Sequence, residues 1–229
     1  MRIPLFDIDW TLLDKDPKRN IHAEAFSYAY EAIYGVKNPK KINVEGMLDN
    51  RIIVKTIVLS GIPEKIAEEK VAEAIEAMKR YFFAHVNEGE VNSMPGVKEL
   101  LSDLKNKNVP LGLLTGNVEA IVWAKLEQAG IKGFFSFGAF GDSALKRTDL
   151  IEVARKKAEK ALNRTVKKKE LVIIGDTPLD ISCAKEGDIE SIGVASGLYP
   201  RLDLEKAGAD LVISSLEEKD KVLEFLQVQ

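Results

Sequence analysis

The chain begins with Ile3-Pro-Leu-Phe-Asp7-Ile-Asp9-Trp-Thr11, an apolar run that ends in two carboxylates. The apolar part is short and continuous, and a polar segment follows it at once. This pattern predicts a buried strand over residues 3–8 that ends in a polar loop. The carboxylates of Asp7 and Asp9 are therefore expected at the C-terminal end of a strand.

Beyond residue 93 the hydrophobic pattern alternates between strand and helix. Strands are predicted over 111–114, 134–137, 170–174, 191–194 and 210–213, and helices over 97–105, 118–129, 149–162 and 180–186. Strands and helices that alternate in this way form a parallel sheet with helices on both faces. The predicted fold class is therefore α/β, with a Rossmann-like parallel sheet as its core.

Polar residues follow two other predicted strands of this core. Strand 111–114 runs into Thr115-Gly116-Asn117, and strand 170–174 runs into Gly175-Asp176-Thr177, with Asp180 one turn further on. In open α/β sheets, ligands bind at the carboxyl ends of the strands. We therefore expect these loops to converge with Asp7 and Asp9 on one polar site.

A segment with helical periodicity and hardly any strand signal separates the first strand from the rest of the core. It extends from about residue 14 to 92, and Pro95-Gly96 marks the return of the alternating pattern. The predicted organisation is a core domain formed by 1–13 and 93–229 and a small all-helical domain over 14–92. Because this segment begins directly after the loop that contains Asp7 and Asp9, we expect it to cover the site as a cap.

The composition excludes several classes of function. With 45% hydrophobic and 30% charged residues, the chain of 229 residues is typical of a globular protein. Its formal net charge of −3 provides no basic field for nucleic acid, and no apolar stretch approaches the ~20 residues that cross a bilayer. One cysteine and an N-terminus without a secretory pattern indicate the cytoplasm. The expected partner is a small molecule, and the sequence does not indicate an oligomeric state.

The carboxylates at the strand ends are suited to phosphoryl transfer. A phosphate monoester requires an in-line nucleophile, a proton for the leaving alkoxide and neutralisation of its oxygens. Asp7 can attack while Asp9 delivers and later recovers a proton. Asp7 and Asp176 together would repel a phosphate unless a hard cation lay between them, and Mg²⁺ prefers such oxygen ligands. The sequence thus predicts Mg²⁺ on Asp7, Asp176 and the backbone carbonyl of Asp9.

Further groups are available for the phosphate itself. The Thr115 side chain and the backbone N–H groups of Gly116 and Asn117 can cradle its oxygens at the start of a helix, where the helix dipole favours anions. Lys146 or Arg147, ahead of helix 149–162, can offset negative charge on the nucleophile and the phosphate. The residues alone do not distinguish Lys146 from Arg147.

In this order and spacing, the motifs resemble those of the haloacid dehalogenase (HAD) superfamily, specifically its capped phosphatases similar to phosphoglycolate phosphatase. The resemblance covers the whole chain. The first motif, Asp-x-Asp-x-Thr, resembles residues 7–11, although Trp10 replaces the usual Gly. The second resembles Leu113-Leu-Thr115, and the fourth resembles Gly175-Asp176-Thr-Pro-Leu-Asp180. The roles implied by the resemblance are nucleophile for Asp7, general acid/base for Asp9, metal ligand for Asp176 and supporting contacts for Thr11 and Asp180.

The resemblance also concerns residues outside these motifs. The third motif is a basic residue before a helix, which fits both the commoner lysine at Lys146 and a variant with Arg147. The family's small helical cap is inserted at the position of 14–92, and such caps select the substrate. A Gly in the cap loop approaches the site, as in Gly46-Met-Leu-Asp49-Asn-Arg51, which makes Asp49 and Arg51 candidates for contact with the leaving group. By contrast, His22 and Cys183 are interpreted mainly as packing residues.

The sequence therefore predicts a magnesium-dependent phosphatase with an aspartyl-phosphate intermediate. Its expected substrates are small phosphorylated metabolites, either phosphoglycolate-like molecules or sugar phosphates. One alternative is a phosphosugar mutase of the beta-phosphoglucomutase type, whose motifs overlap heavily with those of the phosphatases. Another is a non-catalytic regulatory or binding protein that retains the fold, because fold does not fix function.

Overall fold

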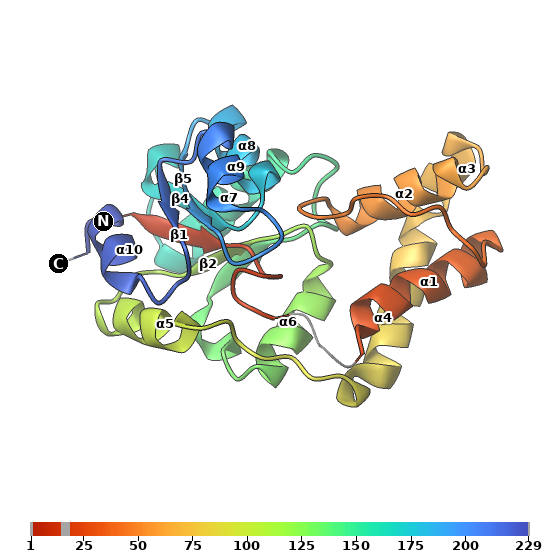
Figure 1. Ribbon diagram of the computed structural model, residues 1–229, viewed down its shortest axis with the longest axis horizontal. Coiled ribbons are helices and arrows are strands. Elements are labelled where there is room, and N and C mark those ends of the chain that lie inside the picture. Colours follow the sequence, from red (N-terminus) through yellow and green to blue (C-terminus); the bar gives the residue numbers. More distant parts are fainter. Residues whose placement is uncertain (1, 15–18, 229) are drawn as a thin grey trace.

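The computed structural model describes residues 2–14 and 19–228. Its core is a six-stranded parallel sheet in the order β3-β2-β1-β4-β5-β6 (Figure 1). The strands are β1 (Ile3–Phe6), β2 (Gly112–Leu114), β3 (Phe137–Ala139), β4 (Leu171–Gly175), β5 (Glu190–Val194) and β6 (Leu211–Ile213). All residues of β1 are buried because it lies between two neighbours and both sheet faces are covered. The predicted α/β fold with a parallel sheet is confirmed.

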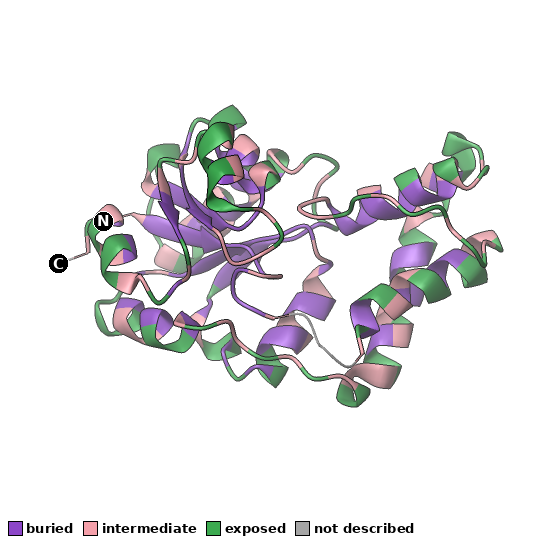
Figure 2. Cartoon of the chain, viewed as in Figure 1, coloured by how far each residue is buried: buried purple, intermediate pink, exposed green. Residues whose placement is uncertain are grey.

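Helices cover both faces of the sheet. They are α5 (Val97–Asn106), α6 (Glu119–Gln128), α7 (Asp149–Leu162), α8 (Pro178–Glu186), α9 (Arg201–Ala207) and α10 (Lys219–Phe225), with short 3₁₀ turns at η2 (Lys132–Phe134) and η3 (Lys168–Glu170). One apolar cluster joins the sheet to α5, α6 and α10, and a second joins it to α7 and α8. Figure 2 shows the buried strands inside this shell of exposed helix faces. In the part of the chain that is described, no helix is both long and apolar enough to span a membrane.

Two parts of the core differ from the prediction. The strand predicted over 134–137 begins only at Phe137, because the apolar run starts inside the 3₁₀ turn η2 and leaves it before pairing with β2. Helices α9 and α10 were not predicted. Each has only seven residues and one fully buried side chain, Leu204 and Val222 respectively, so neither carries a strong periodic signal.

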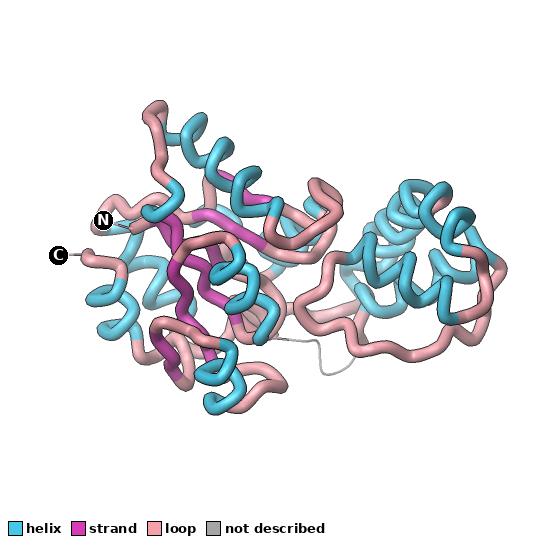
Figure 3. Tube along the Cα trace, turned by 90° about the horizontal axis from the view of Figure 1, so that it is seen from above, coloured by secondary structure: helices cyan, strands magenta, loops and turns pink. Residues whose placement is uncertain are grey.

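Residues 14–92 are called the insert below, and residues 19–92 of it form a helical body beside the core (Figures 1 and 3). Its helices are α1 (Ile21–Tyr34), α2 (Asp49–Leu59), α3 (Glu64–Glu69) and α4 (Val71–His85), followed by the 3₁₀ turn η1 (Val86–Glu88). A third apolar cluster fills the insert and includes two residues of the core. Val118 directly precedes α6, and Ile121 lies in its first turn. The insert therefore packs on the core through the first turns of α6.

The two connections between core and insert run side by side. Leu13 and Ser93 form an antiparallel bridge, the Asp14 N–H donates to Asn92 O at 2.9 Å, and the Met94 N–H donates to Leu12 O at 2.9 Å. The chain therefore leaves the core and returns to it at one point, next to the loop that contains Asp7 and Asp9. The domain boundaries at 13/14 and 92/93 stay a prediction that these contacts suit.

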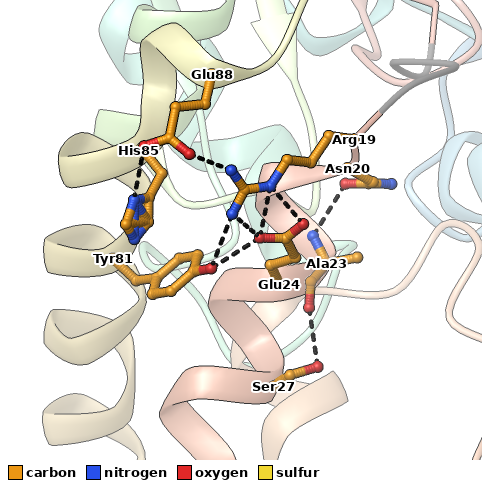
Figure 4. A network of polar contacts seen from close by, with 8 residues as sticks. All are labelled: Arg19, Asn20, Ala23, Glu24, Ser27, Tyr81, His85 and Glu88. Carbon is orange, nitrogen blue, oxygen red and sulfur yellow. Dashed lines mark hydrogen bonds and ion pairs between the residues drawn. The ribbon is translucent and has the colours of Figure 1, made fainter.

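A polar network joins the first and last helices of the insert (Figure 4). Arg19 donates to Glu24 Oε1 at 2.8 Å and also pairs with Glu88, while the Tyr81 hydroxyl donates to Glu24 Oε2 at 2.7 Å. His85 Nδ1 lies 3.3 Å from Glu88. The hydrogen bonds from Arg19 and Tyr81 lower the pKa of Glu24 to about 2. The chain is therefore held together where it enters and leaves the insert.

Candidate active site

Three carboxylates meet at the C-terminal edge of the sheet. Asp7 follows β1 and Asp176 follows β4, and these strands are parallel neighbours with Phe6 opposite Ile174. Asp180 lies in the first turn of α8. One oxygen from each of the three carboxylates lies within 4.8 Å of the others, and all three side chains are buried. Register and crossover topology thus bring together residues that are far apart in the sequence.

Arg147 is the cation beside these carboxylates. Its Nη2 lies 3.3 Å from Asp7 Oδ1 and also bonds to Asp180, while its Nη1 donates to the Gly46 carbonyl at 2.7 Å. Lys146 is exposed and does not line the cavity described below. The loop before α7 therefore points these two neighbours in different directions, and the structure brings Arg147, not Lys146, to the site.

Burial perturbs the ionisation of the carboxylates. Loss of solvent, followed by the charge of Asp180, raises the pKa of Asp7 from 3.8 to about 7, although Arg147 opposes the shift. Loss of solvent, followed by the charges of Asp180 and Asp7, raises the pKa of Asp176 from 3.8 to about 9. The cluster carries more negative charge than Arg147 alone can offset, which disfavours full ionisation.

This excess of buried negative charge fits a divalent cation. Asp180 is already engaged, because its Oδ2 accepts from the Thr177 amide at 3.0 Å and the Thr177 hydroxyl at 2.7 Å, and its Oδ1 accepts from Arg147. Asp7 and Asp176 present the hard oxygen atoms that such ions prefer. The Thr11 hydroxyl donates to Asp176 Oδ1 at 3.3 Å and so holds one of these carboxylates in place.

A second cation, Lys125, contacts the site through Asp9. Its Nζ donates to Asp9 Oδ1 at 2.9 Å and to Asn117 Oδ1 at 2.9 Å, and it lies 3.2 Å from His22 Nδ1. Only 6% of Lys125 is exposed. Lys125 is not part of any motif in the sequence; its one signal is that it is the single lysine in the apolar run of α6 (Glu119–Gln128).

His22 and Asp49 connect this lysine to the insert. His22 Nε2 lies 3.1 Å from Asp49 Oδ2, which also accepts from the Val118 amide at 2.9 Å. Asp49 therefore caps the start of α6, although its side chain still lines the cavity. Arg51, the other predicted contact with the leaving group, pairs with Glu68 at 2.7 Å and does not line the cavity.

The predicted phosphate loop lies against the insert. The Asn117 amide donates to Thr115 Oγ1 at 3.4 Å, and the Gly116 carbonyl accepts from the Asp49 amide at 2.8 Å. A Cβ on Gly116 would lie 2.0 Å from the Met47 carbonyl oxygen. The loop 115–117 is thus in direct backbone contact with the insert, and the start of α6 is already occupied by a protein carboxylate.

The loop of the insert that contains Gly46 lies against the core. Gly46 has φ +74°, and a Cβ there would lie 2.6 Å from Thr177 Oγ1. Trp10 also has a left-handed backbone, with φ +62°, and its carbonyl accepts from Ser196 Oγ at 2.6 Å. Glycine adopts this conformation without strain, which explains why it is usual at the position of Trp10.

A cavity of about 290 Å³ lies between the core and the insert. Its polar lining includes Asp7, Asp9, Arg19, His22, Asp49, Thr115, Gly116, Asn117, Lys125, Arg147 and Asp176, and its apolar lining includes Phe26, Ile52, Phe82 and Val91. All the predicted site residues therefore line this cavity, except for Lys146, Arg51, Thr11 and Asp180. Thr11 and Asp180 lie behind it and contact residues that line it.

Residues 4–194 match the family model described as haloacid dehalogenase-like hydrolase, and the chain belongs to this family. The resemblance drawn from the motifs is thereby confirmed, and with it the prediction of an enzyme of the hydrolase class.

Curated relatives are similar over almost the whole chain. A phosphoglycolate phosphatase from Shigella boydii is 25% identical over 227 residues, which cover 93% of this chain and 88% of that protein. A phosphorylated carbohydrates phosphatase from Thermotoga maritima is 24% identical and covers 99% of this chain and 100% of that protein.

Solved structures share the fold. A predicted phosphatase from Clostridium acetobutylicum has a TM-score of 0.71 at 24% identity and covers 97% of this chain and 98% of its own. A putative beta-phosphoglucomutase from Thermotoga maritima has a TM-score of 0.60 at 22% identity and covers 99% and 100%.

Proposed function

We propose that this hydrolase is a magnesium-dependent phosphatase that transfers the phosphoryl group of a small phosphorylated metabolite to Asp7 and then to water. The observation that carries the proposal is the meeting of the buried Asp7 carboxylate with Asp9, Asp176 and Arg147 at one cavity. The curated relatives named as phosphatases support the same reaction. A cavity of about 290 Å³ suits a small metabolite.

In the first step, a carboxylate oxygen of Asp7 attacks phosphorus and the bond to the ester oxygen breaks. Asp9 gives its proton to the departing alkoxide. Arg147, 3.3 Å from Asp7 Oδ1, favours the ionised nucleophile. The product of this step is an aspartyl phosphate and a free alcohol.

In the second step, Asp9 removes a proton from a water molecule as its oxygen attacks phosphorus. The bond between phosphorus and Asp7 breaks, which releases inorganic phosphate, frees the Asp7 carboxylate and leaves Asp9 protonated as at the start. Thr115 and the amides of Gly116 and Asn117 are the proposed contacts of the phosphate oxygens. Magnesium, when bound by Asp7, Asp176 and the main-chain carbonyl of Asp9, supplies positive charge that offsets the charge of the phosphate.

The direct test is phosphate release from an aryl phosphate by the purified chain with magnesium. Asp7→Asn and chelation of the metal should each abolish release, while thermal unfolding should show that the variant is folded. Full activity of the folded Asp7→Asn variant would contradict the mechanism. A subsequent screen that includes phosphoglycolate and sugar phosphates would identify the substrate class.

A phosphosugar mutase remains the second candidate, because it would use the same Asp7 and Asp9. It would return the phosphoryl group to a sugar instead of water. Incubation with a sugar phosphate separates the two functions: free phosphate supports the phosphatase, and an isomeric sugar phosphate without free phosphate supports the mutase.

A further inference from the structure

The ammonium group of Lys125 is saturated with acceptors from three parts of the chain. Asp9 belongs to the loop after β1, Asn117 to the loop after β2, and His22 to α1 of the insert. A lysine carries three N–H donors, so each donor has one partner. Lys125 itself is buried, and hydrogen bonds are stronger in such surroundings than in water.

Packing does not explain a lysine at this position. Its neighbours on α6 include the buried Ile121, Val122 and Leu126, so an apolar side chain would suit the helix. Removing an ammonium group from water costs free energy, and buried ion pairs are often no more stabilising than apolar residues of similar size. Asp9, the acceptor, has a side chain that is 26% exposed and lines the cavity. Of the three partners of the lysine, all of which line the cavity, Asp9 is the carboxylate proposed to transfer the proton.

We propose that Lys125 is a positioning residue for Asp9. By binding Oδ1 it fixes the orientation of the carboxyl group that delivers the proton to the oxygen of the leaving group. The inference rests on the proposed phosphatase function, because it concerns proton transfer in that reaction.

The insert fixes the position of this lysine through His22. Asp49 is a carboxylate and accepts from His22 Nε2, which leaves Nδ1 as the acceptor for Lys125. The His22 ring also packs on Phe26, at 5.2 Å between ring centroids, and on Phe82, at 6.5 Å. The orientation of Asp9 therefore depends on a side chain that the insert holds in place.

The test compares two substrates that differ in their need for a proton. An alkoxide must be protonated as it leaves, whereas p-nitrophenolate leaves without a proton, and kcat/KM reports the steps up to this departure. Lys125→Met should lower kcat/KM for an alkyl phosphate about 30-fold or more, which is part of the roughly 10²–10⁴-fold contribution of general acid catalysis. For p-nitrophenyl phosphate the loss should be less than about fivefold, so the alkyl-to-aryl ratio falls.

Three further variants make the test specific. His22→Phe keeps the ring packing but removes Nδ1, and should lower the ratio in the same direction by about fivefold. Glu127→Ala is the matched control, because Glu127 also lies on α6 but is exposed, accepts from Lys132 and does not line the cavity; its ratio should not change. In an Asp9→Asn background, Lys125→Met should have no further effect on the ratio.

The outcomes separate the inference from the proposed function. A wild-type chain that hydrolyses neither ester refutes the phosphatase. An active wild type in which Lys125→Met lowers both substrates equally refutes only the role of Lys125. If Lys125→Met does not fold, His22→Phe decides, and an unchanged ratio in that variant overturns the inference.

Discussion

Replacing Asp176 with Asn should stabilise the metal-free protein, and more so at alkaline pH. Burial, together with the charges of Asp180 and Asp7, raises the pKa of Asp176 from 3.8 to about 9. Because the folded state holds this proton more tightly than the unfolded state, stability falls as the pH rises from 3.8 toward about 9. Asparagine has no proton to lose, so the variant lacks this contribution.

The size of the effect follows from the width of that pH window. Each pH unit inside it costs about 1.4 kcal/mol of the free energy of unfolding. Between pH 5 and pH 8, the ionisation of Asp176 alone therefore lowers the free energy of unfolding of the wild type by about 4 kcal/mol at most. Asp7 shares the cluster and has a pKa of about 7, so part of the effect belongs to both residues. We expect the advantage of the variant to grow by at least about 2 kcal/mol over this range.

Urea denaturation with a chelator present, at pH 5 and pH 8, measures this difference. Asp220→Asn is the control, because Asp220 is an exposed aspartate on α10. Addition of magnesium at pH 8 should stabilise the wild type more than Asp176→Asn, since a ligand stabilises the state that binds it. An advantage of the same size at both pH values, or a variant less stable than the wild type at pH 8, would refute the reasoning.

Two sets of substitutions and one labelling experiment test separate features. Gly116→Ala places a Cβ 2.0 Å from the Met47 carbonyl oxygen and should therefore lower kcat/KM about 10- to 100-fold. Gly133→Ala is the control, because a Cβ there has nothing within 4 Å, and it should not lower kcat/KM. Equal activities of the two variants would contradict this account. Trp10→Gly should be about 1 kcal/mol more stable in urea than Trp10→Ala, because φ is +62°; equal stability would argue against backbone strain. Burial raises the pKa of the Cys183 thiol to about 12, so iodoacetamide at pH 8 should label it only after denaturation, and rapid labelling of the native protein would show that the thiol is accessible.

The sequence predicted those parts of the fold and site that depend on local patterns. Asp7, Thr115 and Asp176 each follow a buried strand, and parallel strands bring their C-terminal ends to one edge. The topology therefore brings these residues together once the strands are recognised. The short helices α9 and α10 were missed because a helix of seven residues shows too few turns for its period to be read.

Such local patterns could not predict the contacts between core and insert. Lys146 and Arg147 are adjacent, and only the path of the loop before α7 decides which side chain meets Asp7. Arg51 lies on the same helix as Asp49, yet the helix directs it to Glu68 instead of the cavity. Lys125 meets Asp9 across 116 residues of sequence, and no local motif records that approach.

Both buried cations of the site depend on the insert as well as on the core. Arg147 binds Asp7 and Asp180 and also donates to the Gly46 carbonyl, and Lys125 binds Asp9 and also His22. Each cation thus has one partner that belongs to the insert. If the insert moved away, both side chains would lose a contact that fixes them, and the two carboxylates proposed for catalysis would lose their orientation together. The insert therefore contributes to the geometry of the reacting groups in addition to enclosing the cavity.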